Sequence, residues 1–396
     1  MRVSIVSETY FPEINGVSRA LANLVRFLHA QGDTLQLLVP RYPAPLEDIL
    51  PGMDVNTFAS LPLPLYREVR MPLARPRAVA ERLRQFRPDL LHIATEGTLG
   101  HCALRIARRR GIPVATSYHT NFAAYSRSYF LACLEPLIWR YLRRFHNAAG
   151  VTLCPTESIA VELRRRGFRR VGIWSRGVDS MRFDPRKRDA NVRAQWGIGD
   201  REIVALYAGR LANEKNLNLL LDAFEMLTAT PATSASVRPR LMLVGDGPAR
   251  ARLQRRAGPG TVFTGYQRGE DLAKLYATAE FFVFPSLTET FGNVILEAMA
   301  SGLPVIAFNV PGPKDVIRSG TTGRIVETVS SRALADAMAD LLHAPDRRRA
   351  MGRAAREYAV RQEWSAVNHP VRETYRKLLL MRADQSPGSG IAGVPT

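Results

Sequence analysis

Short runs of β-branched and aliphatic residues alternate with longer stretches whose apolar positions recur every three to four residues. In the first half of the chain the short runs cover 3–7, 34–39, 90–94, 113–118 and 151–154, and the amphipathic stretches cover 17–31, 74–86, 99–110 and 129–146. The second half repeats the alternation, with short runs at 203–207, 240–244, 262–264, 281–284 and 305–307. Because strands that alternate with helices over short linkers form crossover units, we predict an α/β protein of two Rossmann-like, doubly wound domains.

The pattern breaks once, in a polar stretch at 184–199. We therefore predict a first domain over 1–185, a second over 195–362, a last helix over 364–381 and a flexible tail over 386–396. Ligands of such domains bind at the carboxyl ends of the strands, so two facing domains predict a site in the cleft between them.

Composition narrows the class of protein. With 396 residues, 46% of them hydrophobic and 23% charged, the chain is neither a disordered tail nor a fibre. No apolar stretch reaches the roughly 18 residues that span a bilayer, and the N-terminus lacks the pattern of a signal peptide. The 3 cysteines have unrelated spacings, which argues against a disulfide framework or a metal knuckle. The cytoplasm is the expected compartment.

The formal net charge of +19 is concentrated in the first half, where residues 1–180 hold 25 arginines, no lysine and 14 acidic residues. Such a surface attracts nucleic acid, anionic lipid or phosphorylated small molecules. Arginines cluster at 67–87 and 164–170, and they mix with Tyr, Trp and Phe at 125–146. These faces suit the headgroup zone of an anionic membrane or RNA, although amphipathic helices with solvated arginines explain them equally well.

Two loops carry candidate groups for an anion. Gly16 stands at the junction of the first strand and a helix, where backbone amides can approach a ligand, although a turn glycine explains it as well. The surrounding sequence is neither a G-x-G-x-x-G fingerprint nor a P-loop. Arg210 and Lys215 follow the first strand of the second domain and together could neutralise a diphosphate without a metal ion. An exposed loop with a salt bridge to Glu214 is the alternative.

The segment 284–298 gives the strongest signal, because two glutamates stand eight apart in a strand–loop–helix junction. Glu289 lies on the loop, where its carboxylate can accept hydrogen bonds from sugar hydroxyls. Glu297 lies in the helix among small apolar residues, where it should not be buried unpaired, and a ribose diol would be a suitable partner. Amides near Gly292 and Asn293 offer a second anion site. The alternative, two capping or surface glutamates, is less favoured.

Two further strand ends face the predicted cleft. Gly245 and Asp246 form a turn in which Asp246 is expected to cap a helix rather than bind a metal. His119 ends the strand at 113–118 and could donate to a developing charge, although a structural histidine is the alternative. The chain has no D-x-D pair in a strand-end loop, which favours chemistry without a metal ion.

Together these segments resemble the retaining glycosyltransferases of family four, which have the GT-B fold, over about residues 1–380. The resemblance rests on Gly209-Arg210 with Lys215, on Gly245-Asp246-Gly247, and on Glu289 and Glu297 around Thr-Phe-Gly-Asn-Val. It implies that the helix at 364–381 packs back on the first domain. It implies catalytic roles for His119, Glu289, Arg210 and Lys215. It also implies a donor-binding set, which is Gly16, Arg210, Lys215, Gly245, Phe291, Gly292, Asn293 and Glu297.

The segments 118–122 and 174–179 resemble the branch of that family that builds bacterial glycolipids, including α-mannosyl- and glucosyl-lipid synthases. This implies transfer of a hexose, with mannose from GDP-mannose favoured, to a lipid or glycan hydroxyl with retention and without metal or cofactor. Together with the basic and aromatic faces, it favours a cytoplasmic enzyme that is peripheral on the inner face of an anionic membrane, with no nucleic-acid partner. One departure is that Asn15-Gly16-Val17 has one glycine where many relatives have two.

Other functions stay open from the sequence. A UDP-hexose could be the donor, and a GT-B nucleotide-sugar epimerase or phosphorylase would use similar loops. A basic nucleic-acid-binding protein ranks last, because no aromatic RNA-binding signature or recognition helix supports it.

Overall fold

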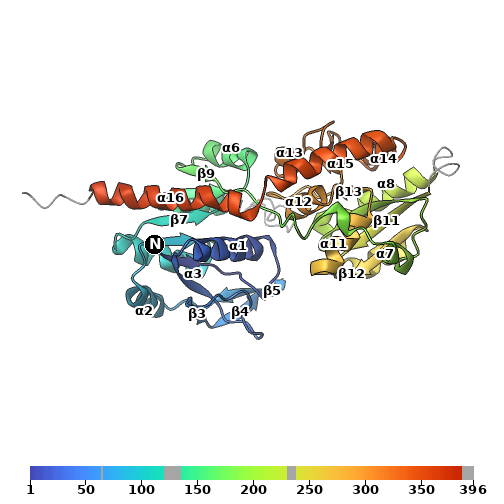
Figure 1. The fold of residues 1–396 in the computed structure, drawn as a ribbon. Coiled ribbons are helices and arrows are strands. Elements are labelled where there is room, and N and C mark those ends of the chain that lie inside the picture. The colour runs from blue at the N-terminus through green and yellow to red at the C-terminus, as the bar shows by residue number, and fades with distance from the viewer. Residues whose placement is uncertain (64–65, 120–134, 230–237, 386–396) are drawn as a thin grey trace, which may run out of the picture.

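The computed structural model describes residues 1–63, 66–119, 135–229 and 238–385 of the chain. Two lobes lie side by side, each built on a parallel β-sheet (Figure 1). Strands of the larger sheet come from residues 2–173 and those of the other sheet from residues 202–326. The prediction of two doubly wound parallel sheets is confirmed.

The first lobe holds a seven-stranded sheet in the order β3-β2-β1-β6-β7-β8-β9, with every neighbouring pair parallel. A separate antiparallel hairpin, β4–β5, lies beside it. The strands are β1 (Arg2–Val6), β2 (Thr34–Pro40), β3 (Asp54–Phe58), β4 (Ser60–Leu63), β5 (Tyr66–Pro72), β6 (Leu90–Ile93), β7 (Val114–Ser117), β8 (Val151–Cys154) and β9 (Val171–Ile173). The helices are α1 (Gly16–Ala30), α2 (Pro76–Phe86), α3 (Thr98–Arg109), α5 (Glu135–Asn147) and α6 (Glu157–Arg165).

The second lobe holds a six-stranded parallel sheet in the order β12-β11-β10-β13-β14-β15. Its strands are β10 (Glu202–Ala208), β11 (Arg238–Val244), β12 (Thr261–Gly265), β13 (Phe281–Phe284), β14 (Val305–Phe308) and β15 (Gly323–Val326). Its helices are η2 (Pro185–Lys187), α7 (Ala190–Gln195), η3 (Asn213–Lys215), α8 (Leu217–Ala229), α10 (Arg250–Arg256), α11 (Gly269–Thr278), α12 (Asn293–Ala300), α13 (Pro313–Val316), α14 (Ser331–Leu342) and α15 (Pro345–Val360).

Helices cover both faces of each sheet because successive strand residues point to opposite sides. In β10, Ala205 and Tyr207 belong to one apolar cluster, whereas Val204 and Leu206 belong to the other. All four side chains are buried. Strands buried on both faces read as continuous apolar runs, which is why the sequence pattern located them.

Several elements differ from the prediction. The pattern missed β3, the hairpin β4–β5, β9 and β15, all of which lie at sheet edges or outside the main sheets. Edge strands have half-exposed, mixed-polarity residues, so their hydrophobic pattern is weak. The helix expected at 129–146 is α5 from residue 135, and its earlier part lies outside the described residues. The stretch 184–199 contains η2 and α7, which pack against α11.

The aromatic side chains of α5 are divided between two environments. Trp139 stacks on Tyr118 with ring centroids 6.4 Å apart, and Phe145 is buried. Phe145 is therefore a core residue and Trp139 is partly buried, so these two rings do not belong to an exposed mixed aromatic and basic face. The exposed side of α5 presents Leu137 and Tyr141 together with Arg140, Arg143 and Arg144.

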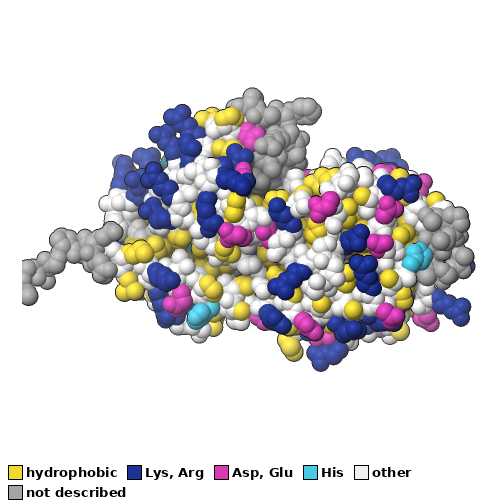
Figure 2. All heavy atoms as spheres, turned by 90° about the horizontal axis from the view of Figure 1, so that it is seen from above, with side chains coloured by type: hydrophobic (Ala, Val, Ile, Leu, Met, Phe, Trp, Pro, Cys, Tyr) yellow, Lys and Arg dark blue, Asp and Glu magenta, His cyan; other side chains and the backbone are white. Residues whose placement is uncertain are grey.

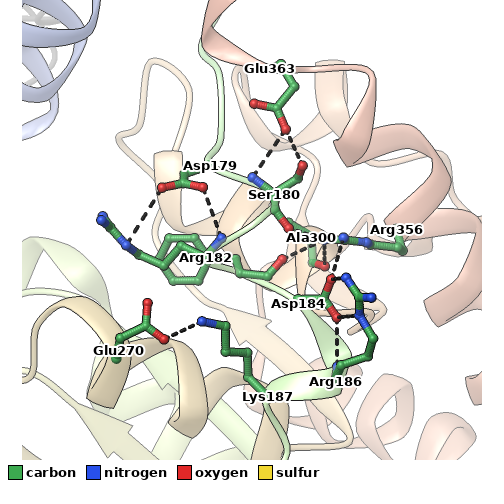
Figure 3. Close-up of polar contacts among 11 residues, drawn as sticks. Asp179, Ser180, Arg182, Asp184, Arg186, Lys187, Glu270, Ala300, Arg356 and Glu363 are labelled. Carbon is green, nitrogen blue, oxygen red and sulfur yellow. Dashed lines mark hydrogen bonds and ion pairs between the residues drawn. The ribbon is translucent and has the colours of Figure 1, made fainter.

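The chain passes between the lobes twice, and the two passages run side by side. The Val178 N–H donates to the Gln362 carbonyl at 2.8 Å, and the Ser180 hydroxyl donates to the Glu363 carboxylate (Figure 3). A Cβ on Gly177 would lie 2.7 Å from the Trp364 Cα, so only glycine fits this contact.

Arg356 of α15 fastens these passages to the second lobe. Its guanidinium donates to the carbonyls of Ser180, Phe183 and Ala300 at 2.9, 2.6 and 2.6 Å, and to Asp184 at 2.9 Å (Figure 3). The single guanidinium of Arg356 thus joins the second lobe to the chain segment that leads from the first lobe into it.

The last helix, α16 (Trp364–Gln385), crosses back and lies along the first lobe (Figure 1). It packs on α1, and Arg372 pairs with the buried Asp33 at 2.8 Å. Among the residues that the structure describes, no helix is long and apolar enough to cross a membrane.

Candidate active site

The two lobes touch through loops and helices that follow the carboxyl ends of their strands. Arg19 of α1 contacts Glu297 of α12 at 2.7 Å, and the Thr290 hydroxyl donates to the His119 carbonyl at 2.9 Å. A Cβ built on Gly16 would lie 3.6 Å from Asn293 Nδ2. We call the region defined by these residues the interlobe seam. Strand ends are where sheets of this type bind ligands.

Lys215 and Glu289, 74 residues apart in sequence, meet as an ion pair. The chain turns back after η3 because Asn216 adopts the left-handed conformation (φ 56°), which asparagine tolerates. Glu289 also accepts a hydrogen bond from the Ser286 hydroxyl at 3.2 Å. The side chains are 19% and 17% exposed, so the pair lies near the surface and a ligand can reach it.

Arg210 lies on the same loop as Lys215. Its side chain is exposed, and its carbonyl accepts a hydrogen bond from the Tyr207 hydroxyl at 3.0 Å. The buried tyrosine therefore fixes the backbone from which Arg210 extends.

Helix α12 begins where the second predicted anion site was expected. Its N-cap is Gly292 with φ 84°, which has no side chain to cap the first-turn amides. These N–H groups carry the positive end of the helix dipole. Asn293 is the first helical residue and faces Gly16 across the seam. The Phe291 side chain is buried in the core of the second lobe, so its backbone alone could meet a ligand.

Glu297 is buried, with 7% of its surface exposed, yet it already has protein partners. Its Oε1 pairs with Arg19 at 2.7 Å and its Oε2 accepts from the Tyr276 hydroxyl at 3.0 Å. The carboxylate is therefore not buried unpaired, as expected, and its partners in the free protein are Arg19 and Tyr276. A carboxylate has about four acceptor positions, so these two contacts leave room for a ribose hydroxyl.

Gly16 stands at the start of α1, and its neighbours are already engaged. The Asn15 side chain accepts from the N–H groups of Val17 and Ser18, both at 2.9 Å. An anion at this helix end would have to compete with Asn15 for these donors.

Gly245 lies where two strand-end loops of the second lobe cross. A Cβ there would stand 2.0 Å from the Gly209 carbonyl oxygen, and φ is +133°. Glycine is required for this close approach, which positions the loop of Arg210. Asp246 accepts from the Gly247 N–H at 2.7 Å, whereas α10 begins at Arg250 with Ala249 as its N-cap. The prediction that Asp246 caps the helix is wrong.

His119 follows β7 and is buried at the seam. Its Nδ1 lies 2.6 Å from an Arg176 Nη2, and its ring meets that of Trp174 edge-on at 5.3 Å. Burial, together with the charge of Arg176, holds the pKa of His119 well below its usual range. The imidazole is neutral at physiological pH.

The sequence pattern missed Arg19 and Arg176. A signal for Arg19 existed, because cations are disfavoured in the first turn of a helix, where the dipole is positive. Arg176 lies in the segment 174–179, which carried only a resemblance, and its contact with His119, 57 residues away, was not predicted because only the fold joins them.

The interlobe seam thus combines cationic side chains, carboxylates and helix-start amides, which suit a diphosphate and a polyhydroxylated group. Within the described ranges, no cluster of three or more His, Cys, Asp or Glu residues could hold a metal ion.

Comparison with known families agrees with this arrangement. Residues 14–182 match the family described as Glycosyltransferase Family 4, and residues 189–358 match Glycosyl transferases group 1. The two matches correspond to the two lobes.

Individual relatives extend over most of the chain. A GDP-mannose-dependent alpha-mannosyltransferase of Mycobacterium tuberculosis is 36% identical over 373 residues, 93% of this chain and 94% of the relative. An alpha-monoglucosyldiacylglycerol synthase of Streptococcus pneumoniae is 28% identical over 352 residues, 82% of this chain and 75% of the relative. Among solved structures, sucrose-phosphate synthase from Thermosynechococcus elongatus superposes with a TM-score of 0.79 at 21% identity, covering 96% of this chain and 100% of that one.

Proposed function

The chain belongs to the family-four glycosyltransferases, and from this premise we propose that it transfers mannose from GDP-mannose to a hydroxyl group of a glycolipid acceptor. The observation that carries the proposal is the 36% identity, over 93% of the chain, to a GDP-mannose-dependent alpha-mannosyltransferase. A UDP-hexose is the second candidate donor.

The interlobe seam supports a donor site. Lys215 and Arg210 stand on one loop, where they can neutralise a diphosphate, and the start of α12 adds amide donors. Glu289 can accept hydrogen bonds from hydroxyl groups of the transferred sugar, and Glu297 can accept them from the ribose. We assign the diphosphate to the region between Lys215 and the start of α12.

We further propose that the reaction retains the configuration at the anomeric carbon. The bond between C1 and the phosphate oxygen breaks, and the electron pair leaves with GDP. The acceptor hydroxyl forms the new bond on the same face, and its proton passes to a phosphate oxygen. Lys215 and Arg210 stabilise the charge that grows on the leaving diphosphate, which is the dominant contribution of the protein in this scheme. The scheme assigns no step to a metal ion or a cofactor.

The first lobe supports an acceptor held at a membrane surface. Figure 2 shows Lys and Arg side chains gathered on this lobe. On α5 the exposed Leu137 and Tyr141 accompany three exposed arginines, a combination that suits anionic headgroups above acyl chains. We propose a peripheral enzyme on the cytoplasmic face of the membrane, with no nucleic-acid partner.

A transfer assay tests the function. Purified protein is incubated with radiolabelled GDP-mannose or UDP-glucose and phosphatidylglycerol vesicles containing diacylglycerol, and the lipid fraction is counted. We expect mannolipid with an α linkage, identified from its one-bond C1–H1 coupling. If only glucolipid forms, UDP-glucose rather than GDP-mannose is the donor. A β linkage would refute retention. Free epimerised donor without acceptor would refute the transferase assignment.

Matched lysine variants connect the assay to the seam. Lys215→Met should lower transfer by about 10²-fold, because a preorganised cation at the leaving group is lost. Lys187→Met removes a lysine that pairs with Glu270 elsewhere on the same lobe (Figure 3), and should leave transfer unchanged. Flotation with anionic and neutral vesicles tests the membrane surface separately, and absence of binding to either would contradict it.

A further inference from the structure

The contact between Arg176 and His119 fixes where the imidazole carries its proton. Arg176 Nη2 lies 2.6 Å from His119 Nδ1. A guanidinium only donates hydrogen bonds, so Nδ1 must be the acceptor nitrogen. In a neutral imidazole the other nitrogen then carries the proton. His119 is therefore the Nε2–H tautomer.

Arg176 is held in place without a carboxylate. It is buried, with a second hydrogen bond from Nη1 to the Trp174 carbonyl at 3.2 Å and its guanidinium 5.2 Å from the Trp174 ring centroid. No carboxylate of the described residues pairs with it. Burial lowers the pKa of Arg176 to about 10, which leaves it protonated at neutral pH. A buried cation without a counter-charge costs stability, which favours a functional reason for its presence.

The orientation of the His119 ring is constrained by the last helix. Trp174 meets the His119 ring and donates from Nε1 to Asn368 of α16 at 3.0 Å. Trp174 also meets the ring of His92, whose nitrogens contact Tyr375 and Ser117. The His119 ring is thus held in one orientation, and its proton is held on Nε2.

Among the described residues, the proton-bearing nitrogen of His119 has no hydrogen-bond partner. His119 Nε2 is buried, and no described residue lies within hydrogen-bond distance of it. An unsatisfied buried donor lowers stability, so a bound ligand that accepts this hydrogen bond would recover that free energy. The His119 carbonyl accepts from Thr290, the neighbour of Glu289, which places this residue at the proposed donor site.

We propose that Arg176 is a positioning residue that holds His119 as a neutral Nε2–H donor toward an oxygen atom of the bound nucleotide sugar. This inference rests on the proposed function for the identity of that ligand, whereas the tautomer is a property of the protein alone. The groups that face His119 are Arg176, His92 and His146. Burial lowers the pKa of His92 to about 3, so His92 is neutral as well.

Nuclear magnetic resonance of protein with ¹⁵N-labelled histidine tests the tautomer without any substrate. In wild type we expect His119 as the neutral Nε2–H tautomer at pH 6, because burial and the charge of Arg176 lower its pKa. An Nδ1–H tautomer or an imidazolium at pH 6 would overturn the proposal. Arg176→Met should give a mixture of tautomers that titrates, and Arg176→Lys, which still donates, should restore Nε2–H. Arg166→Met is the matched control, because Arg166 stacks on Trp139 without contacting a histidine ring.

Kinetics with the active nucleotide sugar complete the test. Arg176→Met should lower kcat by about 10–10²-fold, Arg176→Lys less, and Arg166→Met not at all. Equal losses in the lysine and methionine variants, with the tautomer unchanged, would show a merely structural role. If GDP-mannose is inert but the tautomer behaves as described, the donor assignment fails and the role of Arg176 in setting the tautomer stands.

Discussion

The Lys215–Glu289 ion pair predicts that removing the carboxylate strengthens binding of the nucleotide while it weakens transfer of the sugar. In the free protein Lys215 is paired with Glu289, so a diphosphate must share or displace that partner. Glu289→Gln keeps the side-chain volume, releases the lysine and removes a negative charge beside the phosphates. GDP lacks the transferred hexose, so its affinity reports on the nucleoside and diphosphate contacts without those to the sugar.

The magnitude follows from the exposure of the pair. At 19% and 17% exposure it lies between surface pairs, worth about 0.2–1 kcal/mol, and buried pairs, whose disruption costs about 3–5 kcal/mol. We take about 1.4 kcal/mol, which corresponds to a tenfold tighter Kd for GDP. Transfer of the hexose should fall by about 10²-fold, because the acceptor for the sugar hydroxyls is lost.

Isothermal titration calorimetry with GDP measures the first effect, and the lipid transfer assay measures the second. Glu270→Gln is the matched control, since Glu270 also pairs with a lysine of the second lobe, Lys187, outside the seam. GDP binding that is unchanged or weaker in Glu289→Gln would refute the reasoning, because it would show that Lys215 does not reach the diphosphate.

Three further predictions address the framework of the site, all measured by guanidinium unfolding. Arg19→Ala leaves the buried Glu297 without its cation and should lower the free energy of unfolding by about 1–2 kcal/mol. An unchanged free energy would mean that this contact between the lobes does not stabilise the protein. Gly245→Ala, whose Cβ would meet a carbonyl at 2.0 Å, should cost about 3 kcal/mol, whereas Gly258→Ala, with nothing within 4 Å, should stay within about 0.5 kcal/mol. Burial raises the pKa of Glu8 from 4.5 to about 7, so its stabilising contribution is complete below about pH 4.5 and disappears as the pH rises through 7. Glu8→Gln should remove that decline of up to about 3 kcal/mol, and an equal decline in both proteins would contradict it.

The sequence located the elements whose burial is two-sided, because their residues form uninterrupted apolar runs. It also placed Lys215 and Glu289 at strand ends, and parallel topology brings strand ends together, so their meeting followed from the fold class. The partners of Glu297 and His119 could not be derived in this way. Arg19 of the first lobe contacts Glu297 of the second, and Arg176 contacts His119 although 57 residues separate them in sequence. No local sequence pattern encodes contacts between residues so far apart in the chain.

The α5 helix shows a different limit. Helical spacing placed Trp139 and Phe145 among arginines, but periodicity alone does not say which side of an amphipathic helix faces the core. Tyr118 and Phe168 supply the aromatic partners that turn Trp139 inward, and neither is close to it in sequence.

In the proposed complex, the interlobe seam holds the diphosphate of the donor between Lys215 and the start of α12. A crystal structure of the chain with GDP-mannose tests it most directly. We expect phosphate oxygens within hydrogen-bond distance of Lys215 Nζ and of the first α12 amides, with the mannose hydroxyls donating to Glu289. Nucleotide bound elsewhere, with Lys215 still occupied by Glu289 alone, would contradict it.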